Sequence, residues 1–245
     1  MFFPDLTHRR RSHELMDDPN IDPKLLQRSL GYLRKINILL RYTQQLLDRL
    51  ETYSQRWDRN DTIRIVDIGT GSADMPIAVL KWGQERGWKV HCTGVDLHAK
   101  TAKAARDASA DPRLTIVRGN ALDLPFHDGA FDYAITSTFL HHLDTDDVVK
   151  VIAGMSRIAR RGVVIADLVR SYHAYVGIKL ATAFANPVVR HDGPASIAQG
   201  FTKAEVMEMR DRAGLSYTTY DEYFYNRFIL AGEKTVGRDE DPAAL

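Results

Sequence analysis

The chain has 245 residues, of which 44% are hydrophobic and 27% are charged. Its 33 basic and 32 acidic residues give a net charge of +1, so no global field attracts it to nucleic acid or to an anionic membrane. This length suits one domain with appendages. The single cysteine, Cys92, excludes an intrachain disulfide. With no signal peptide and no long apolar run, we expect a cytoplasmic protein without a membrane span.

Residues 1–61 are expected to form a helical extension or lid. A basic cluster at residues 8–13, HRRRSH, is either a solvated tail or a flap over a site. From Asp22 to about Arg56, leucine and isoleucine recur every three or four residues, which predicts one long helix or two shorter ones. Asp22 suits the N-cap and Pro23 the first helical position. The apolar face of this segment could bury a homodimer contact as readily as cover a site.

Residues 62–235 are expected to form an α/β domain, followed by a tail at 236–245. Apolar runs predict strands at Ile63–Ile68, Val90–Val95, Leu114–Arg118, Tyr133–Thr136 and Val163–Ala166. Amphipathic segments predict helices at Ala73–Gln84, Ala99–Ser109 and Asp146–Arg160. Such βα repeats imply a parallel sheet with helices on both faces. Two further β-rich runs, Ser216–Tyr220 and Arg227–Ala231, are joined by a link that is too short for parallel strands, so they are expected to pair antiparallel.

The stretch IRIVDIGTGSADMPIA, residues 63–78, is typical of a strand that turns into a helix over a bound ligand. Gly69 and Gly71 allow a ligand to approach the backbone closely. A dinucleotide fingerprint would place its third glycine at position 74, which is Asp74 here. A carboxylate at this helix start repels a pyrophosphate, which disfavours a nicotinamide oxidoreductase. The turn therefore favours a ligand without phosphates, and better still a positively charged one.

The ends of the next two strands complete the expected pocket. Asp96 ends the second strand, where an acid can accept both hydroxyls of a ribose. Asn120 follows the third strand, and apolar residues between Leu122 and Phe126 supply walls. This combination suits an adenosine that carries a charged tail and no phosphate.

Four motifs in this order, VDIGTGSADMP, GVDLH, GNALDLPFHDGAFD and TSTFLHHL, resemble those of class I S-adenosylmethionine-dependent methyltransferases. The similarity is greatest to small-molecule enzymes near the ubiquinone/menaquinone C-methyltransferases and to natural-product O-methyltransferases, and it extends over about residues 63–220. It implies a Rossmann-like fold with a seven-stranded, mostly parallel sheet, an antiparallel last strand and helices on both faces.

The resemblance also implies a set of cofactor-binding residues for S-adenosylmethionine. Asp67, Gly69, Thr70 and Gly71 would flank the methionine portion. Asp96 would hold the ribose hydroxyls, and Leu97 would lie against the face of the adenine. Asn120 and Ala121 would meet the adenine edge, and Thr136 or Ser137 would lie near the sulfonium and amino group. Two positions depart from the family pattern. Ala73 replaces a third glycine, which should leave binding intact, and Asn120 replaces the usual Asp, which removes a charge-assisted hydrogen bond.

Methyl transfer to an acidic oxygen or carbon also requires a base, most often a histidine. His141 and His142 follow the fourth strand, and at most one is expected to face the substrate because adjacent side chains diverge. Some natural-product O-methyltransferases have a similar histidine pair with an aspartate after the fifth strand, which corresponds to Asp167. The alternatives are that both histidines only stabilise a turn and that Asp167 is the N-cap of the following helix.

Candidate substrate contacts lie further along the chain. A polar turn is expected at Arg190–Gly193, where His191 and Asp192 would belong to a substrate lid. Tyr172 is a candidate contact, and with Tyr175, Phe184 and Phe201 it either lines an aromatic cavity or belongs to the core. Thr202 and Glu205 form a capping box for the next helix.

These features predict methyl transfer to a small apolar or aromatic metabolite, with S-adenosylhomocysteine as the by-product. O-methylation is favoured over C-methylation because the two histidines and Asp167 offer a base. The alternative is an accessory protein that binds the cofactor without catalysis. Asn186 and Pro187 continue as Val-Val and do not follow the fourth strand, which is unlike the nucleic-acid amino-methyltransferases. No residue pattern predicts a magnesium or zinc site, so no metal is expected.

Overall fold

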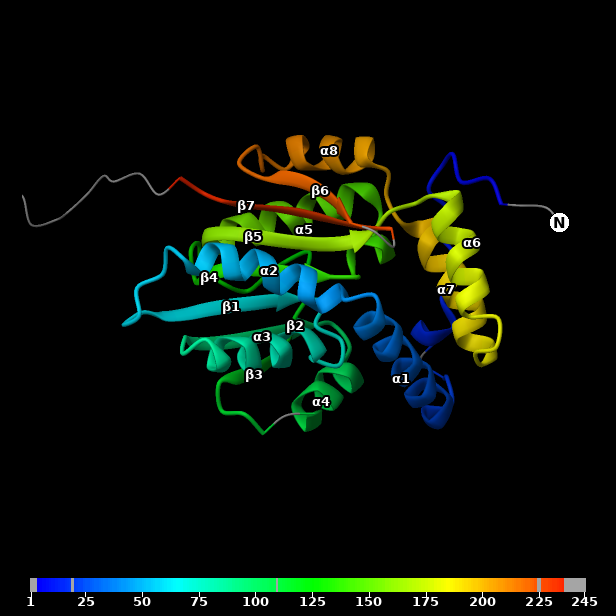
Figure 1. Cartoon of the computed structure of the whole chain (residues 1–245), viewed down its shortest axis with the longest axis horizontal. Coiled ribbons are helices and arrows are strands. Elements are labelled where there is room, and N and C mark those ends of the chain that lie inside the picture. Colours follow the sequence, from blue (N-terminus) through cyan, green and yellow to red (C-terminus); the bar gives the residue numbers. More distant parts are fainter. Residues whose placement is uncertain (1–3, 19, 109, 224–225, 236–245) are drawn as a thin grey trace, which may run out of the picture.

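The computed structural model describes residues 4–18, 20–108, 110–223 and 226–235; the expected tail at 236–245 lies outside these ranges. Seven strands form one sheet in the order β3-β2-β1-β4-β5-β7-β6 (Figure 1). They are β1 (Thr62–Ile68), β2 (Lys89–Asp96), β3 (Leu114–Arg118), β4 (Phe131–Ser137), β5 (Ala159–Leu168), β6 (Thr219–Tyr223) and β7 (Arg227–Glu233). Neighbours pair in parallel except at β7, which runs antiparallel to both β5 and β6.

The predicted fold class, including the antiparallel last strand, is confirmed. The differences lie at strand ends, where pairing extends a strand beyond its apolar run. The fifth strand begins at Ala159, before the predicted start at Val163, because Ala159 pairs with Phe131 of β4. Similarly, the sixth strand is displaced toward Tyr223, which pairs with Arg227.

The helical elements are η1 (Leu15–Asp17), α1 (Pro23–Leu39), α2 (Tyr42–Ser54), α3 (Asp74–Glu85), α4 (Ala99–Ala108), η2 (Leu140–His142), α5 (Thr145–Ile158), α6 (Tyr172–Ala181), α7 (Pro187–Gln199) and α8 (Lys203–Arg212). The N-terminal stripe forms two helices. Oδ1 of Asp22 accepts a hydrogen bond from Leu25 N at 2.8 Å, as expected of the N-cap. Arg41 separates the helices with a left-handed φ of 54°. Among the described residues, we find no helix with the length and hydropathy needed to cross a bilayer.

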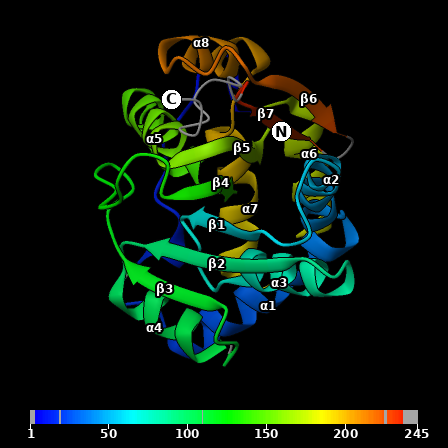
Figure 2. The same ribbon diagram turned by 90° about the vertical axis from the view of Figure 1, so that its left-hand side faces the viewer.

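Helices cover both faces of the sheet (Figure 2), and a buried apolar cluster lies on each face. On one face, Leu46 and Leu50 of α2 pack with Val79 of α3 against β1. On the other face, α5 packs against β4 and β5, and α8 packs against α5; Met155 and Val206 belong to that cluster. Helix α4 packs on β2 and β3. The core therefore consists of two layers separated by the sheet.

Helices α1, α6 and α7 lie beyond the carboxyl ends of the parallel strands (Figure 1). The prediction of a turn at Arg190–Gly193 is wrong, because these residues lie inside α7. Asn186 caps this helix by accepting from Val189 N at 3.1 Å. A Cβ on Gly193 would lie 3.1 Å from Cγ1 of Ile178, so this glycine allows α6 and α7 to pack closely and does not mark a turn.

Candidate active site

The order of the strands reverses between β1 and β4, which is where open α/β sheets bind ligands. The loop after β1 has three left-handed residues, Gly69 (φ 73°), Gly71 (φ 54°) and Ala73 (φ 61°). A Cβ on Gly69 would lie 2.3 Å from Cγ of Phe139, whereas a Cβ on Gly71 would meet no heavy atom within 4 Å. Gly71 therefore leaves open backbone on this loop. Ala73 costs about 1–2 kcal/mol in this conformation.

Two carboxylates lie against this loop. Asp67 is 3% exposed, and burial, together with the negative charge of Asp96, raises its pKa to about 7. Asp96 accepts hydrogen bonds from Gly71 N at 3.1 Å and from His98 N at 2.9 Å, which ties the end of β2 to the loop. Thr70 is buried between them, and its side chain fills the space beside Gly94 of β2. The accessible backbone at Gly71 therefore lies close to two carboxyl groups, those of Asp67 and Asp96.

Apolar side chains flank the same edge beside β2 and β3. Leu97 is 53% exposed and Leu122 is 40% exposed, although both are large apolar residues. Asn120 is exposed, and its Oδ1 accepts from Leu122 N at 3.0 Å, while Ala121 is half-buried. Because a carbonyl oxygen has two lone pairs, Asn120 can still accept a second hydrogen bond. The exposed leucines fit the face of an adenine, and the remaining lone pair on Oδ1 of Asn120 fits a donor at the adenine edge.

The two hydroxyl residues at the end of β4 have different environments. Thr136 is fully buried and donates to the Ile68 carbonyl at 2.7 Å, so it holds β4 to β1. Ser137 is half-buried and accepts from Nη2 of Arg227 at 2.8 Å. The hydroxyl of Ser137 is therefore hydrogen-bonded to a side chain, whereas that of Thr136 is hydrogen-bonded to the backbone.

His141 and Asp167 form a buried pair at the ends of β4 and β5. Nδ1 of His141 lies 2.7 Å from Oδ1 of Asp167, and the side chains are 2% and 0% exposed. Oδ2 of Asp167 accepts from Leu140 N at 2.8 Å, and Oδ1 also accepts from Leu168 N at 2.7 Å. Burial alone would raise the pKa of Asp167, but the charge and hydrogen bond of His141 lower it to about 2. An ionised Asp167 places the imidazole proton on Nδ1 and leaves Nε2 as a base.

The helix N-cap alternative for Asp167 is wrong. Ser171 caps α6, because its Oγ accepts from Ala174 N at 3.1 Å, and Asp167 lies within β5. His142 is less buried than His141, and the two rings lie 4.2 Å apart between centroids. Both histidines belong to η2, which begins just after the turn at Thr138. The structure brings the three predicted catalytic residues together.

An N-terminal arm, residues 4–18, crosses the histidine pair. Arg9 donates to the His141 carbonyl at 2.7 Å and to the Gln199 carbonyl at 2.7 Å, and Arg11 donates to the His142 carbonyl at 3.0 Å. Glu14 is 4% exposed and accepts from Ser196 and Gln199. Its Oε1 lies 3.9 Å from Nε2 of His141. These contacts favour the flap alternative over a solvated tail.

Asp192, a predicted substrate residue, holds this arm. It is 1% exposed and accepts from Leu15 N at 2.8 Å and from Met16 N at 2.9 Å. Oδ1 also lies 2.8 Å from Nδ1 of His191, whose side chain is 50% exposed. Asp192 therefore satisfies the backbone donors at the start of η1, in the way that an N-cap does.

A buried arginine, which sequence reasoning missed, lies beside the pair. Arg227 is 1% exposed, donates through Nη2 to Ser137 and Thr138 at 2.8 Å each, and lies under the Tyr42 ring at 4.0 Å. An arginine directly before the apolar run FILAG was the sequence pattern that could have revealed it. Glu14 had no such pattern, because the arm has no periodicity.

A family model described as a methyltransferase domain matches residues 65–162, which carry β1 through the start of β5. The demethylmenaquinone methyltransferase of Listeria monocytogenes serotype 4a (strain HCC23) is 26% identical over 173 residues, covering 64% of this chain and 71% of the relative. That of Roseiflexus sp. (strain RS-1) is 36% identical over 105 residues, covering 43% of this chain and 42% of the relative. These matches support a class I S-adenosylmethionine-dependent methyltransferase.

Solved structures show that the methyltransferase shares its fold with enzymes of low sequence identity. The plantazolicin methyltransferase in complex with SAH superposes with a TM-score of 0.67 at 11% identity, covering 87% of this chain and 91% of that one. Magnesium protoporphyrin IX methyltransferase from Synechocystis PCC 6803 with bound SAH gives a TM-score of 0.56 at 17% identity, covering 84% and 94%. At these identities the likeness shows the fold alone.

Of the two alternatives for the aromatic residues, a shared cavity or the core, the shared cavity does not form. Phe184 is fully exposed, whereas Phe201 is 1% exposed and belongs to the core. Tyr175 packs beside Ile178 in a separate small cluster. Tyr172 is 47% exposed, and its hydroxyl accepts from Leu6 N of the arm at 3.5 Å. Tyr172 and Tyr175 lie on α6, Phe184 lies in the turn after it, and Phe201 lies in an isolated bridge with Val169, so the four aromatics do not surround one ligand.

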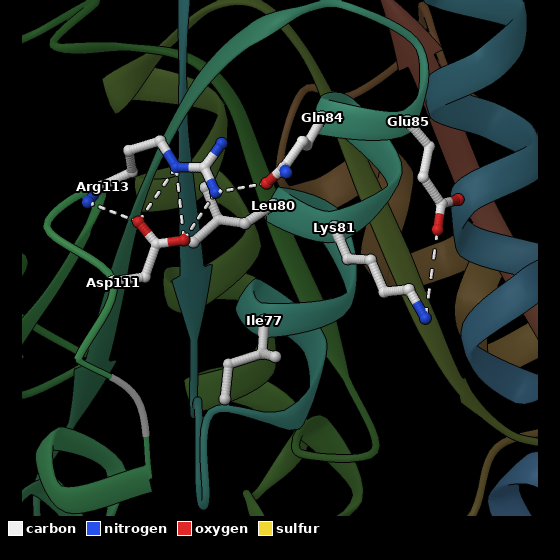
Figure 3. A pocket seen from close by; sticks show the side chains of 7 residues that line it. All are labelled: Ile77, Leu80, Lys81, Gln84, Glu85, Asp111 and Arg113. Atoms are coloured by element: carbon white, nitrogen blue, oxygen red, sulfur yellow. Dashed lines mark hydrogen bonds and ion pairs between the residues drawn. The ribbon is translucent and has the colours of Figure 1, made fainter.

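A cavity of about 440 Å³ on α3 is not the active site of the methyltransferase (Figure 3). Its lining residues are Ile77, Leu80, Lys81, Gln84, Glu85, Asp111 and Arg113. Asp111 and Arg113 precede β3, so the cavity faces the amino ends of the strands. Arg113 pairs with Asp111 at 2.6 Å and Lys81 with Glu85 at 3.9 Å, so these charges are neutralised within the chain.

Proposed function

We propose that the methyltransferase transfers a methyl group to a hydroxyl oxygen of a small aromatic or apolar metabolite, with His141 as the base. The buried 2.7 Å contact between His141 and Asp167 carries this proposal, because it fixes the imidazole with Nε2 as the proton acceptor. Asp167 would orient His141 and stabilise the imidazolium that forms. The names of the relatives, demethylmenaquinone methyltransferases, support an aromatic acceptor of the quinone type.

The residues at the β1–β2–β3 edge fit S-adenosylmethionine, which supplies an electrophilic methyl group on a sulfonium when bound. Asp67 and the loop from Gly69 to Gly71 would hold its charged methionine portion. Asp96 would accept from the ribose hydroxyls, and Leu97 and Leu122 would enclose the adenine. Ser137 would lie nearer than Thr136 to the reacting end, because the Thr136 hydroxyl is bound to the backbone. Asn120 would accept from the adenine edge without charge assistance.

The acceptor would lie between the histidine pair and the arm. Methyl transfer needs alignment of nucleophile, methyl and sulfur and exclusion of water more than it needs further charge stabilisation. The arm and α7 would exclude water there, with Tyr172 and His191 at the border of the covered region. We also propose that the reaction needs no metal and that the protein is cytoplasmic; a homodimer stays a prediction.

Calorimetry with S-adenosylmethionine and a methyl-transfer assay on phenols and hydroquinones test this function. Expected are cofactor binding and an alkali-stable methyl ether, detected by mass and proton spectra. Binding without turnover on any acceptor would favour the accessory alternative, and no binding would refute the proposal. A methyl group found on a ring carbon would show C-methylation and refute the proposed O-methylation.

Asp96→Ala tests the proposed ribose position. Loss of two charge-assisted hydrogen bonds is expected to weaken cofactor binding by about tenfold to a hundredfold or more. Asp96→Asn is the matched comparison, because it removes the charge but keeps one oxygen, which can accept from either Gly71 N or His98 N. An Asp96→Ala affinity within twofold of the wild type would place the ribose elsewhere.

A further inference from the structure

Arg227 carries a buried positive charge that the chain itself satisfies only in part. Its Nη2 group donates to the hydroxyls of Ser137 and Thr138, while Nε and Nη1 are buried and have no hydrogen-bond partner among the described residues. Three of the five guanidinium N–H donors therefore lack an acceptor. A buried charge without a partner is costly, and natural proteins keep such groups where a ligand or a function requires them.

The position of Arg227 connects this charge to the proposed reaction. Strand β7 runs antiparallel to β5, so its first residue lies at the edge where β1, β4 and β5 end. In the register of the two strands, Arg227 is opposite Leu168, which directly follows Asp167. The two hydroxyls that it contacts immediately precede Phe139 and η2. The open donors of Arg227 thus lie at the same edge as the His141–Asp167 pair.

Among the residues that the structure describes, no carboxylate forms an ion pair with Arg227. Tyr42 covers one face of the guanidinium with its ring at 4.0 Å. Asp167 influences Arg227 electrostatically, but its two oxygens accept from His141 and from backbone N–H groups. Ser137 and Thr138 are neutral. Within the described part of the chain nothing completes the hydrogen bonding of Arg227, which leaves its open donors available to a ligand.

We propose that Arg227 binds a negatively charged oxygen substituent, a carboxylate or an ionised phenol, on the methyl acceptor. This inference rests on the proposed function and adds a substrate class to it. The cofactor carboxylate offers the same chemistry, but, apart from Thr136 and Ser137 at the end of β4, the residues that fit the cofactor cluster at β1, β2 and β3. Arg227 lies on β7, beyond β5, at the same edge of the sheet as the proposed base. The acceptor is therefore an aromatic or apolar acid.

A charge-preference experiment tests this proposal without knowledge of the natural acceptor. The protein saturated with S-adenosylhomocysteine is titrated with 2-naphthoate and with 2-naphthamide, which have nearly the same shape and differ in charge. We expect the wild type to bind the naphthoate at least tenfold more tightly. Arg227→Met should reduce this preference below twofold and leave the affinity for S-adenosylhomocysteine within twofold. Arg227→Lys should retain part of the preference, because it keeps the charge.

Arg49→Met is the control for the change in net charge, because Arg49 of α2 already has partners in Asp221 and Tyr223 of β6. It should keep the full preference. Equal affinities of the wild type for both probes, or no binding of either, overturn the proposal even if Arg227→Met does not fold. Loss of S-adenosylhomocysteine affinity in Arg227→Met with an unchanged preference would assign the guanidinium to the cofactor. Failure of the wild type to bind S-adenosylhomocysteine refutes the proposed function instead.

Discussion

Oε1 of Glu14 lies 3.9 Å from Nε2 of His141, so the N-terminal arm faces the proposed base across a buried contact. Nε2 is the atom that has to receive the acceptor's proton. The acceptor hydroxyl must therefore take a position beside Glu14 or displace it. This relationship makes the arm part of the path by which an acceptor reaches the site.

Removal of the Asp192 carboxylate is expected to release the arm. Asp192→Ala leaves the backbone N–H groups of Leu15 and Met16 without their acceptor, at a cost of about 1–3 kcal/mol each. Trypsin should then cut after Arg9, Arg10 and Arg11 at least several times faster than in the wild type. Asp144→Ala is the control, because its exposed ion pair with Arg11 contributes little. Equal cleavage rates for the two variants would show that Asp192 does not hold the arm.

Substitution of the buried pair should reduce kcat. His141→Ala and Asp167→Asn are each expected to lower kcat about 10²- to 10⁴-fold, the usual contribution of a positioned base, with little change in cofactor affinity. His142→Ala is the matched control and should lose less, because the contact with Asp167 belongs to His141. Steady-state kinetics on a phenolic acceptor measure these effects. A larger loss in His142→Ala than in His141→Ala would reverse the assignment.

Cofactor affinity should depend on pH through Asp67. Its pKa of about 7 means that the carboxyl is protonated below pH 7, and binding of a cationic ligand must then release a proton. The affinity for S-adenosylmethionine should fall by up to about tenfold for each pH unit below 7. In the absence of ligand, the raised pKa of Asp67 means that the folded state binds more protons than the unfolded state between about pH 4 and 7. The free energy of unfolding should therefore decline as pH rises over this range.

Calorimetry at several pH values, in buffers of different ionisation enthalpy, checks this proton release. Asp67→Asn serves as the comparison, because its side chain has a similar shape and does not titrate. Its binding should be independent of pH below 7. Parallel slopes in the wild type and in Asp67→Asn would assign the pH dependence to another group.

Metal removal should leave activity unchanged. Glu14, His141 and His142 each place one potential ligand atom within 4.8 Å of the others. However, Oε1 of Glu14 already accepts from Ser196 and Gln199, and its 3.9 Å distance to His141 exceeds the roughly 3.3 Å between ligands of a tetrahedral zinc ion. Activity before and after dialysis against EDTA, with elemental analysis, tests this. Stoichiometric metal, and activity that returns only when it is added back, would contradict the prediction.

Much of the fold could be predicted from the sequence, because hydrophobic periodicity and turn chemistry are local properties. Asp22 caps α1, and Thr202 and Glu205 form the expected capping box. The link between the last two β-rich runs correctly predicted antiparallel pairing. The interior of α7 could not be predicted, because Gly193 and Pro194 also suit a turn and their helical role depends on packing against α6.

The candidate site was predictable where it follows strand ends and not where distant segments meet. His141 and Asp167 come together because β4 and β5 are neighbours, which a parallel sheet allows one to expect. The contact of Glu14 with His141 and the approach of Arg227 to Ser137 depend on the path of the arm and on an antiparallel register. Local patterns do not encode either contact.

A crystal structure with S-adenosylhomocysteine would show where the cofactor binds and which way its sulfur faces. We expect ribose hydroxyls within hydrogen-bonding distance of Asp96, adenine between Leu97 and Leu122, and the sulfur directed toward the space beside Nε2 of His141. A ligand bound in another part of the chain, or a sulfur directed away from His141, would contradict this expectation.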